Sequence, residues 1–220
     1  FPLGGVSVEN DVAQFPESKF YCCPGESLVL FKSNTPRSEW HRFLHAVMDV
    51  AERHNVKEVY TIGGMVSFSA HTAARQLFAV FNSAKMKKDF SQYALRRDMD
   101  YETPPDQRPT LSSFLLWVSQ NKNITAASLW VPLPFYLLPN EDHAACRKVV
   151  HFFDRRFSLG IDFSDLDQAV KTQNEKIAQV RLTFPRLDTY ISNLESNVAL
   201  SQEESEKLAK ELEEYLKRIE

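Results

Sequence analysis

The residues best suited to chemistry in this sequence are His71, Thr72 and Arg75, which follow a glycine pair at Gly63-Gly64. An imidazole, a hydroxyl and a guanidinium can together bind an anion, and the forked guanidinium suits a phosphate or a carboxylate. Arg108, in a later charged loop, supplies a further cation. The sequence therefore predicts a rim for an anion or another ligand, made of Gly63, Gly64, His71, Thr72, Arg75 and Arg108.

The same side chains also have a purely structural interpretation. Arg75 can pair with a carboxylate of the protein, and His71 can bond to the backbone, so that both hold their loop in shape. Pairing of this kind is commoner than ligand binding. We prefer it here and keep the ligand rim as the alternative.

The sequence offers no stronger catalytic or metal-binding pattern. His41, His45 and Asp49 follow one another at intervals of four on the polar side of a predicted helix. Imidazoles at that spacing can share a metal ion, but a solvated face is the simpler interpretation. The sequence contains no phosphate loop, dinucleotide fingerprint, nucleophile elbow or kinase signature. We therefore predict no catalytic residue, no metal and no cofactor.

The rim residues are expected between two β-strands. Residues 59–62 are mainly β-branched or aromatic, as in strands. The glycine pair then interrupts the run, because glycine tolerates a positive φ or close approach by another backbone. Residues 77–81 form a second apolar run, and we predict that the two runs are neighbouring strands joined by an elbow. Open α/β sheets place their binding sites at such strand ends.

The preceding residues predict a parallel crossover. Residues 28–31 read as a fully buried strand, a helix is expected with Pro36 at its first position and an end at His54-Asn55, and residues 56–62 form the next strand. These lengths suit a right-handed strand–helix–strand unit. The later elements are expected to be a helix over 85–95, a surface loop over 97–109, a helix from about Thr110, a strand over 126–131 and a helix over 141–157. Pro132 and Pro134 are expected to prevent a continuous central ladder after that strand.

The composition shifts near Ile161, where three amphipathic stretches begin. They need a partner surface, which the sheet domain, the stretches themselves or another subunit can supply. We therefore predict an α/β domain over residues 1–162 and a helical appendage over residues 163–220. The aromatic segment from Leu129 to Tyr136 and the last helices offer more apolar surface than 220 residues need. The predicted interface comprises Trp130, Phe135, Tyr136, Leu212, Tyr215 and Leu216.

The overall composition is that of an ordinary globular protein, with 43% hydrophobic and 25% charged residues. The formal charge of −3 gives no basic field for nucleic acid. The longest apolar run is far below the roughly 20 residues of a membrane span. Three cysteines, two of them adjacent, make a poor disulfide framework and favour a reducing compartment such as the cytoplasm.

Several segments together resemble the proteasome assembly chaperone family, which includes archaeal and bacterial relatives of the second eukaryotic chaperone. The resemblance extends from about Phe15 onward, and its order and spacing are more specific than any one motif. The segments are Thr61-Ile-Gly-Gly-Met65, His71-Thr72 with Arg75, Arg108-Pro-Thr110, Ala127-Ser-Leu-Trp-Val-Pro132, Pro134-Phe-Tyr136, Pro139-Asn140, Gly160-Ile-Asp162 and Tyr190-Ile-Ser-Asn-Leu-Glu195.

The resemblance implies a three-layer α/β sandwich with a mainly parallel sheet, similar to nucleoside phosphorylases, and C-terminal helices. Members of the family would begin with a further strand and helix, which this chain lacks before Phe1. The resemblance also implies a prokaryotic, non-enzymatic assembly or adaptor protein that forms homo-oligomers, trimers or larger, and has proteasome subunits as candidate partners. The alternative is a small-molecule enzyme or binder with an anion at His71, Arg75 and Arg108. An ATP-dependent amine ligase is a weaker third hypothesis, because no nucleotide-binding residues are found.

Overall fold

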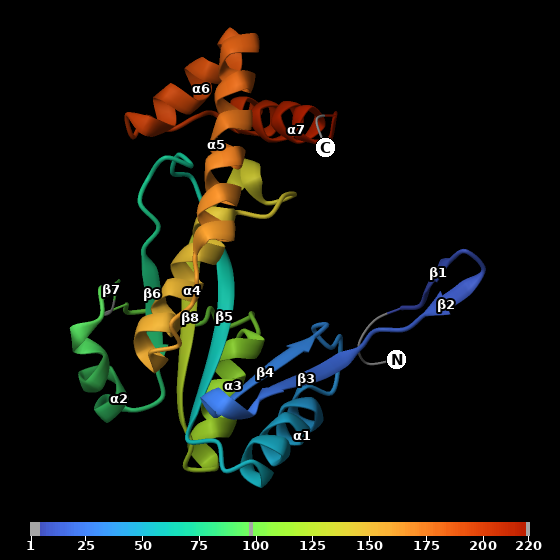
Figure 1. The fold of residues 1–220 in the computed structure, drawn as a ribbon, viewed down its shortest axis with the longest axis vertical. Helices are drawn as coiled ribbons and strands as arrows, with labels where there is room; N and C mark the ends of the chain where they lie inside the picture. The colour runs from blue at the N-terminus through green and yellow to red at the C-terminus, as the bar shows by residue number, and fades with distance from the viewer. Residues whose placement is uncertain (1–4, 97–98, 219–220) are drawn as a thin grey trace. The chain divides into compact units, whose positions relative to one another are not determined.

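A computed structural model describes residues 5–96 and 99–218, which form two compact units. Among these residues, the first unit comprises 5–59, 81–83 and 102–127, and the second comprises 60–80, 84–96, 99–101 and 128–218. Seven α-helices and a mainly parallel central sheet lie within the described residues, which confirms the mixed α/β class. Figure 1 shows the elements in chain order.

The first unit combines two hairpins with two packed helices. Its elements are β1 (Ser7–Glu9), β2 (Val12–Gln14), β3 (Ser18–Cys23), the 3₁₀ turn η1 (Pro24–Glu26), β4 (Leu28–Ser33), α1 (Trp40–Arg53) and α3 (Leu111–Asn121). β1 pairs with β2 and β3 with β4, both antiparallel. The predicted crossover is therefore wrong, because β4 joins β3 in a separate sheet instead of the sheet that contains β5 (Glu58–Ser67).

Helices α1 and α3 form the core of the first unit. Leu44 and Met48 of α1 pack with Leu115 and Val118 of α3 and with Ile124. The predicted start of α3 is confirmed, since the Thr110 hydroxyl accepts a hydrogen bond from the Ser113 amide and so caps the helix. Lys122 extends from the end of α3 to two carboxylates of α1, at 3.0 Å from Asp49 and 2.7 Å from Glu52.

Most of the central sheet and the remaining helices belong to the second unit. Besides β5, they are β6 (Leu77–Phe81), α2 (Ala84–Asp89), η2 (Phe90–Gln92), β7 (Leu95–Arg96), β8 (Thr125–Pro134), η3 (Phe135–Leu137), α4 (His143–Phe157), α5 (Ser164–Thr183), α6 (Pro185–Glu195) and α7 (Gln202–Arg218). The helix predicted over 85–95 is shorter than expected, because the chain turns through η2 and pairs as β7.

The strand order is β5-β8-β6-β7, so β5 and β6 are not the neighbours that the sequence predicts. β8 lies between them. The Thr61 hydroxyl donates to the Ser128 hydroxyl at 2.9 Å, which places the beginnings of β5 and β8 side by side. β7 runs parallel to β6. The residue after β6, Asn82, bonds to Ala126 at the beginning of β8, and β6 therefore runs opposite to β8.

This antiparallel junction explains why two prolines fit into a central strand. Asn82 lies beside Ala126, so counting back along β6 brings its first residue, Leu77, level with about residue 131 of β8. Beyond that level, β5 is the only strand of the described residues that pairs with β8. Pro132 and Pro134, which lack an amide proton, therefore cost no bond to β6. The predicted end of the strand at residue 131 is wrong for this reason.

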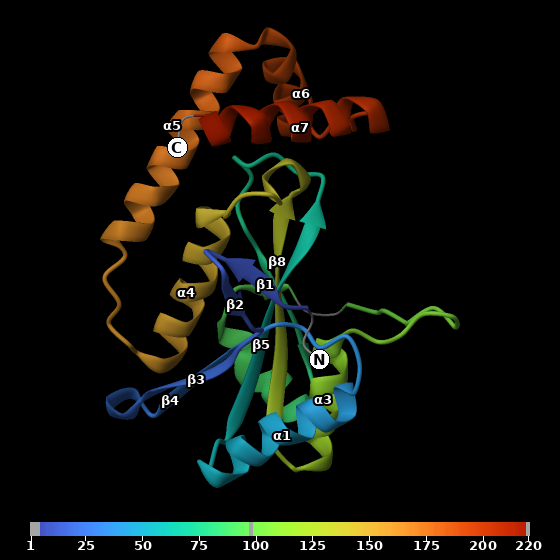
Figure 2. The same ribbon diagram turned by 90° about the vertical axis from the view of Figure 1, so that its right-hand side faces the viewer.

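The C-terminal helices share one core with the end of the sheet. α5, α6 and α7 contact one another, and α7 also packs on η3 (Figures 1 and 2). The buried residues of this core come from the segment after β5, from η3 and from α5–α7. They are Ala70, Tyr136, Leu137, Ile177, Val180, Leu187, Tyr190, Ile191, Leu194, Leu208, Leu212 and Leu216. The start of α7 is capped by reciprocal hydrogen bonds between Ser201 and Glu204.

The glycine pair lies inside β5 and does not end it. Only Gly160 among the described glycines has a positive φ, at 66°. A Cβ on Gly63 would lie 2.8 Å from two ring atoms of Trp130, and a Cβ on Gly64 would lie 2.4 Å from the terminal Cδ1 of Leu133. The glycines therefore make room for the side chains of the neighbouring strand β8, and this is why the predicted break is wrong.

We expect Gly63→Ala to lower the free energy of unfolding by about 1–3 kcal/mol, because the indole ring of Trp130 cannot yield without disturbing β8. Gly64→Ala should cost less, since the end of the Leu133 side chain can rotate away. Gly25→Ala is the control, because nothing lies within 4 Å of its added Cβ. Urea unfolding measures all three variants. Equal losses for Gly63→Ala and Gly25→Ala would contradict the close approach.

Candidate functional site

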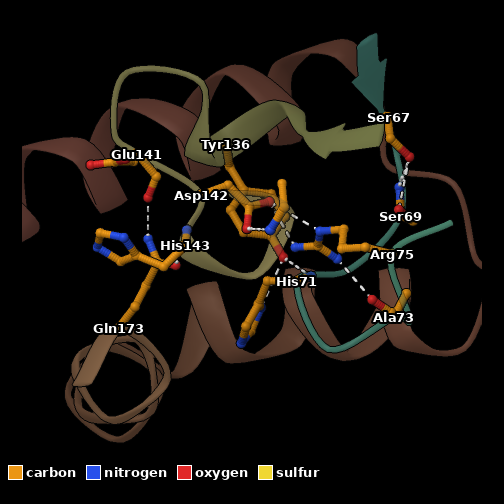
Figure 3. Close-up of polar contacts among 11 residues, drawn as sticks. Ser67, Ser69, His71, Ala73, Arg75, Tyr136, Glu141, Asp142, His143 and Gln173 are labelled. Carbon is orange, nitrogen blue, oxygen red and sulfur yellow. Dashed lines mark hydrogen bonds and ion pairs between the residues drawn. The ribbon is translucent and has the colours of Figure 1, made fainter. Parts of the chain in front are cut away.

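Three segments of the second unit meet around a set of polar side chains (Figure 3). The loop between β5 and β6 supplies His71, Thr72 and Arg75. Tyr136 comes from η3, directly after β8, and Asp142 immediately precedes α4. The carboxyl ends of β5 and β8 lead into these segments, so the cluster lies where α/β sheets commonly place a site.

A buried ion pair lies at the centre of the cluster. Arg75 Nε and Nη2 lie 3.0 and 2.9 Å from the same oxygen of Asp142, Oδ2. The side chains are only 6% and 3% exposed. Arg75 Nη1 also donates to the Ala73 carbonyl at 2.7 Å. The other carboxylate oxygen, Oδ1, accepts the Ala145 amide at 3.0 Å and so caps α4. The pair therefore joins the β5–β6 loop to the start of α4.

Tyr136 holds His71 through two contacts to one hydroxyl group. The hydroxyl accepts a hydrogen bond from the His71 amide at 2.6 Å and lies 2.9 Å from His71 Nδ1. The hydroxyl proton can be donated to Nδ1 when the proton of the neutral imidazole is on Nε2. Burial lowers the pKa of His71 from 6.5 to about 4 and raises the pKa of Tyr136. Both groups are therefore neutral at physiological pH.

Thr72 links the same loop to the C-terminal helices. Its hydroxyl donates to Glu195 Oε1 of α6 at 3.1 Å. Arg181 of α5 binds both oxygens of Glu195, at 2.8 and 3.1 Å, and also Asp188 at 2.6 Å. The hydrogen bond from Arg181, together with that from Thr72, lowers the pKa of Glu195. A second link joins α5 to the residues just before α4, because Gln173 Nε2 donates to the Glu141 carbonyl at 2.7 Å (Figure 3).

The structure thus brings three of the six predicted rim residues together and places the others elsewhere. The side chains of His71, Thr72 and Arg75 are each bonded to a protein group, in agreement with the structural interpretation of Arg75. Gly63 and Gly64 lie within β5 beneath side chains of β8. Arg108 is exposed on the loop before α3, in the first unit.

The predicted interface residues divide in a similar way. Tyr136, Leu212 and Leu216 are buried in the core that the chain forms with itself, so a contact between subunits cannot use them as they stand. Phe135 and Tyr215 are partly buried against the same core. Trp130 packs over Gly63. Most of the predicted interface residues thus make their apolar contacts within the chain itself.

Sequence reasoning missed Asp142 and Glu195, the two carboxylates that complete the cluster. Asp142 had a detectable signal, because an aspartate directly before a helix is a favoured N-cap. Its pairing with Arg75 depends on a contact between residues 67 positions apart, which no local pattern reveals. Among residues 5–96 and 99–218, no group of three or more His, Cys, Asp or Glu side chains is arranged to hold a metal ion. None of the helices in those ranges combines the length and apolar character of a membrane span.

Comparisons with known proteins identify relatives of this fold. The model of the PAC2 family matches residues 4–181. A search of curated proteins found no match. Similar solved structures include the Mycobacterium tuberculosis unknown function protein Rv2714, at 18% identity and a TM-score of 0.69 over 87% of this chain and 65% of that one. The chain thus spans less than two thirds of the length of that relative.

Other similar structures have names that refer to the proteasome. One is the M. tuberculosis proteasome-assembly chaperone homologue Rv2125, at 17% identity and a TM-score of 0.63 over 80% of this chain and 74% of that one. Another is Pyrococcus furiosus PbaB, an archaeal proteasome activator, at 16% identity and a TM-score of 0.60 over 80% of this chain and 77% of that one. At these identities the likeness shows the fold alone.

Removing the cation of the buried pair should strongly destabilise the protein. We expect Arg75→Met to lower the free energy of unfolding by about 3–5 kcal/mol, because it leaves the Asp142 carboxylate buried without a counter-charge. Arg42→Met is the matched control: Arg42 is 84% exposed, and its contact with Glu39 should contribute less than about 1 kcal/mol. Denaturant unfolding gives both values. An Arg75→Met loss no larger than the control would show that the pair does not hold the loop.

The depressed pKa of His71 predicts a specific pH dependence. Its pKa is about 4 in the folded protein and near 6.5 in the unfolded chain, so between these values only the unfolded chain binds the proton. The contribution of His71 to stability is therefore complete above pH 6.5 and is lost as the pH falls to about 4, at up to ~1.4 kcal/mol per pH unit.

We expect His71→Asn to reduce this slope, whereas His54→Asn, which changes an exposed histidine, should not. Unfolding midpoints from pH 7 to pH 4 measure the difference. Parallel pH profiles for wild type and His71→Asn would contradict the burial of a neutral imidazole.

Proposed function

We propose that this chain, which belongs to the PAC2 family, is a non-enzymatic assembly chaperone or adaptor that works through protein–protein contacts. The family supports a chaperone-like role. Two of the similar structures are named as a proteasome-assembly chaperone homologue and a proteasome activator, which makes proteasome subunits the first candidates for partners.

The observation that carries this proposal is the exposed apolar surface of the hairpins in the first unit. Tyr21 of β3 lies opposite Leu30 of β4, and their exposed fractions are 49% and 52%. The other side of the hairpin has a different environment, because Phe31 contacts Phe20 and also Phe43 of α1. The side that carries Tyr21 and Leu30, which we call the hairpin face, therefore presents large apolar side chains to solvent.

The backbone of this hairpin adds a second reason to expect a partner. Within the described residues, β3 and β4 pair only with each other, so both outer edges have free backbone donors and acceptors. A two-stranded hairpin is only marginally stable alone and is completed by further strands or by packing. Unpaired edges beside exposed apolar residues are typical of surfaces that bind another chain.

The polar cluster around Arg75 also favours the adaptor role over a small-molecule enzyme. A small-molecule enzyme built on His71 and Arg75 would need these groups to face a ligand. Instead, Arg75 is neutralised by Asp142, and His71 is held by Tyr136. An internal scaffold of this kind suits a protein that presents a surface. It gives no specific support to the small-molecule or amine-ligase alternatives.

We further propose that the protein forms homo-oligomers, trimers or larger, in the cytoplasm. Self-association would cover the hairpin face, and the three free cysteines suit a reducing compartment. Single exposed apolar residues need no explanation, whereas a cluster on one small sheet does.

Two substitutions test the hairpin face. We expect the wild-type chain to sediment as an oligomer at micromolar concentration, and Tyr21→Glu/Leu30→Glu to dissociate it, because carboxylates cannot be buried unpaired in an apolar contact. Val198→Glu/Leu182→Glu is the matched control, since both residues are exposed and lie among the C-terminal helices. Analytical ultracentrifugation distinguishes the outcomes. A wild-type monomer would contradict the oligomer proposal.

The adaptor role has a separate test. Purified proteasome subunits from the source organism should bind the wild-type chain and should assemble faster in its presence. Absence of both effects in an organism that has a proteasome would remove the assembly role and leave the family membership unaffected.

A further inference from the structure

A small hollow in the second unit is lined by cationic side chains and is separate from the cluster around Arg75. Its lining includes Lys148, His151 and Arg155 of α4, Tyr93 shortly before β7, Leu95 of β7, and Leu77 at the start of β6. The volume is about 60 Å³. Lys148, His151 and Arg155 follow one another at intervals of three and four, so they project from one side of the helix.

The charges around this hollow are unbalanced. Two permanent cations and an imidazole line it, and none of the lining residues is acidic, although the chain as a whole has a formal charge of −3. Within residues 5–96 and 99–218, neither Lys148 nor Arg155 forms an ion pair. By contrast, Arg147 on the same helix pairs with Asp167. A cluster of unpaired cations repels itself and favours an added anion.

The floor of the hollow is apolar and firmly packed. Phe152 is 5% exposed and lies edge-on to Tyr93, with ring centroids 5.4 Å apart. Tyr93 also contacts Phe90 at 5.6 Å. Charges beside such a surface are less well screened than charges in open water, so an anion held there would be attracted more strongly.

The size of the hollow limits its ligand to a single small group. A volume of 60 Å³ is about twice the roughly 30 Å³ that one water molecule occupies, and well below the roughly 300–1,000 Å³ of pockets that enclose whole ligands. A tetrahedral oxyanion fits this size, whereas a nucleotide does not. The arginine fork and the lysine ammonium also suit the oxygens of a phosphate.

We propose that this hollow binds a phosphate group, either as inorganic phosphate or as the phosphate of a monoester whose organic part extends outward past Tyr93. A dianion is preferred to a carboxylate because two permanent cations face it. Lys148 and Arg155 contact the phosphate oxygens, and His151 donates a further hydrogen bond. This site is independent of the proposed adaptor role and of the residues around Arg75.

Titration of the full chain with inorganic phosphate and with phenyl phosphate tests the proposal. Calorimetry gives the Kd, and amide NMR spectra give the location through shifts at Tyr93, His151 and Arg155. We expect saturable binding at millimolar concentration or below, and a Kd at least about tenfold higher for Lys148→Gln/Arg155→Gln, because each charged contact contributes roughly a tenfold change. Tighter binding of phenyl phosphate indicates a monoester, whereas equal binding indicates free phosphate.

The matched control is Arg186→Gln/Lys210→Gln, which removes the same charge from exposed positions on α6 and α7. It should bind phosphate with the wild-type Kd. Thermal melting of both double variants shows whether each is folded. The proposal is overturned if neither probe binds, or if both double variants weaken binding equally, since the effect would then be one of overall charge.

Discussion

The buried ion pair between Arg75 and Asp142 is the contact on which the second unit depends most. It places two charges where water cannot solvate them, and each charge is tolerated only because the other lies about 3 Å away. The same carboxylate caps α4, and the same guanidinium binds the carbonyl of Ala73. This one ion pair therefore joins the loop after β5 to the start of α4.

The neighbouring contacts extend this bracing to the C-terminal helices. Tyr136 holds the backbone and the ring of His71, and Thr72 bonds to Glu195, which is itself bound by Arg181. His71, Thr72 and Arg75, which the sequence suggested as part of a binding rim, thus use their polar groups to hold the fold together. The two surfaces that we propose for binding lie elsewhere, on the hairpin face of the first unit and at the cationic hollow beside α4.

Local patterns predicted the helices well and the sheet poorly. α3, α4 and α7 were predictable because caps at Thr110, Asp142 and Ser201 and regular apolar spacing act within a few residues. The sheet order was not, because the position of β8 between β5 and β6 depends on contacts between residues 67 and 44 positions apart in the sequence. Gly63 illustrates the limit. A glycine at this position predicts that another group approaches the backbone closely. That this group is the side chain of Trp130 could be identified only from the pairing of β5 with β8.

The structural role of Arg75 is tested most directly by NMR of its side chain while phosphate is added. A guanidinium that is buried and bonded to Asp142 and Ala73 should show a dispersed Nε–H signal that exchanges slowly with water and does not move with phosphate. A rapidly exchanging, averaged signal that shifts as phosphate binds would contradict the account, because Arg75 would then be a ligand-binding residue and not a structural one.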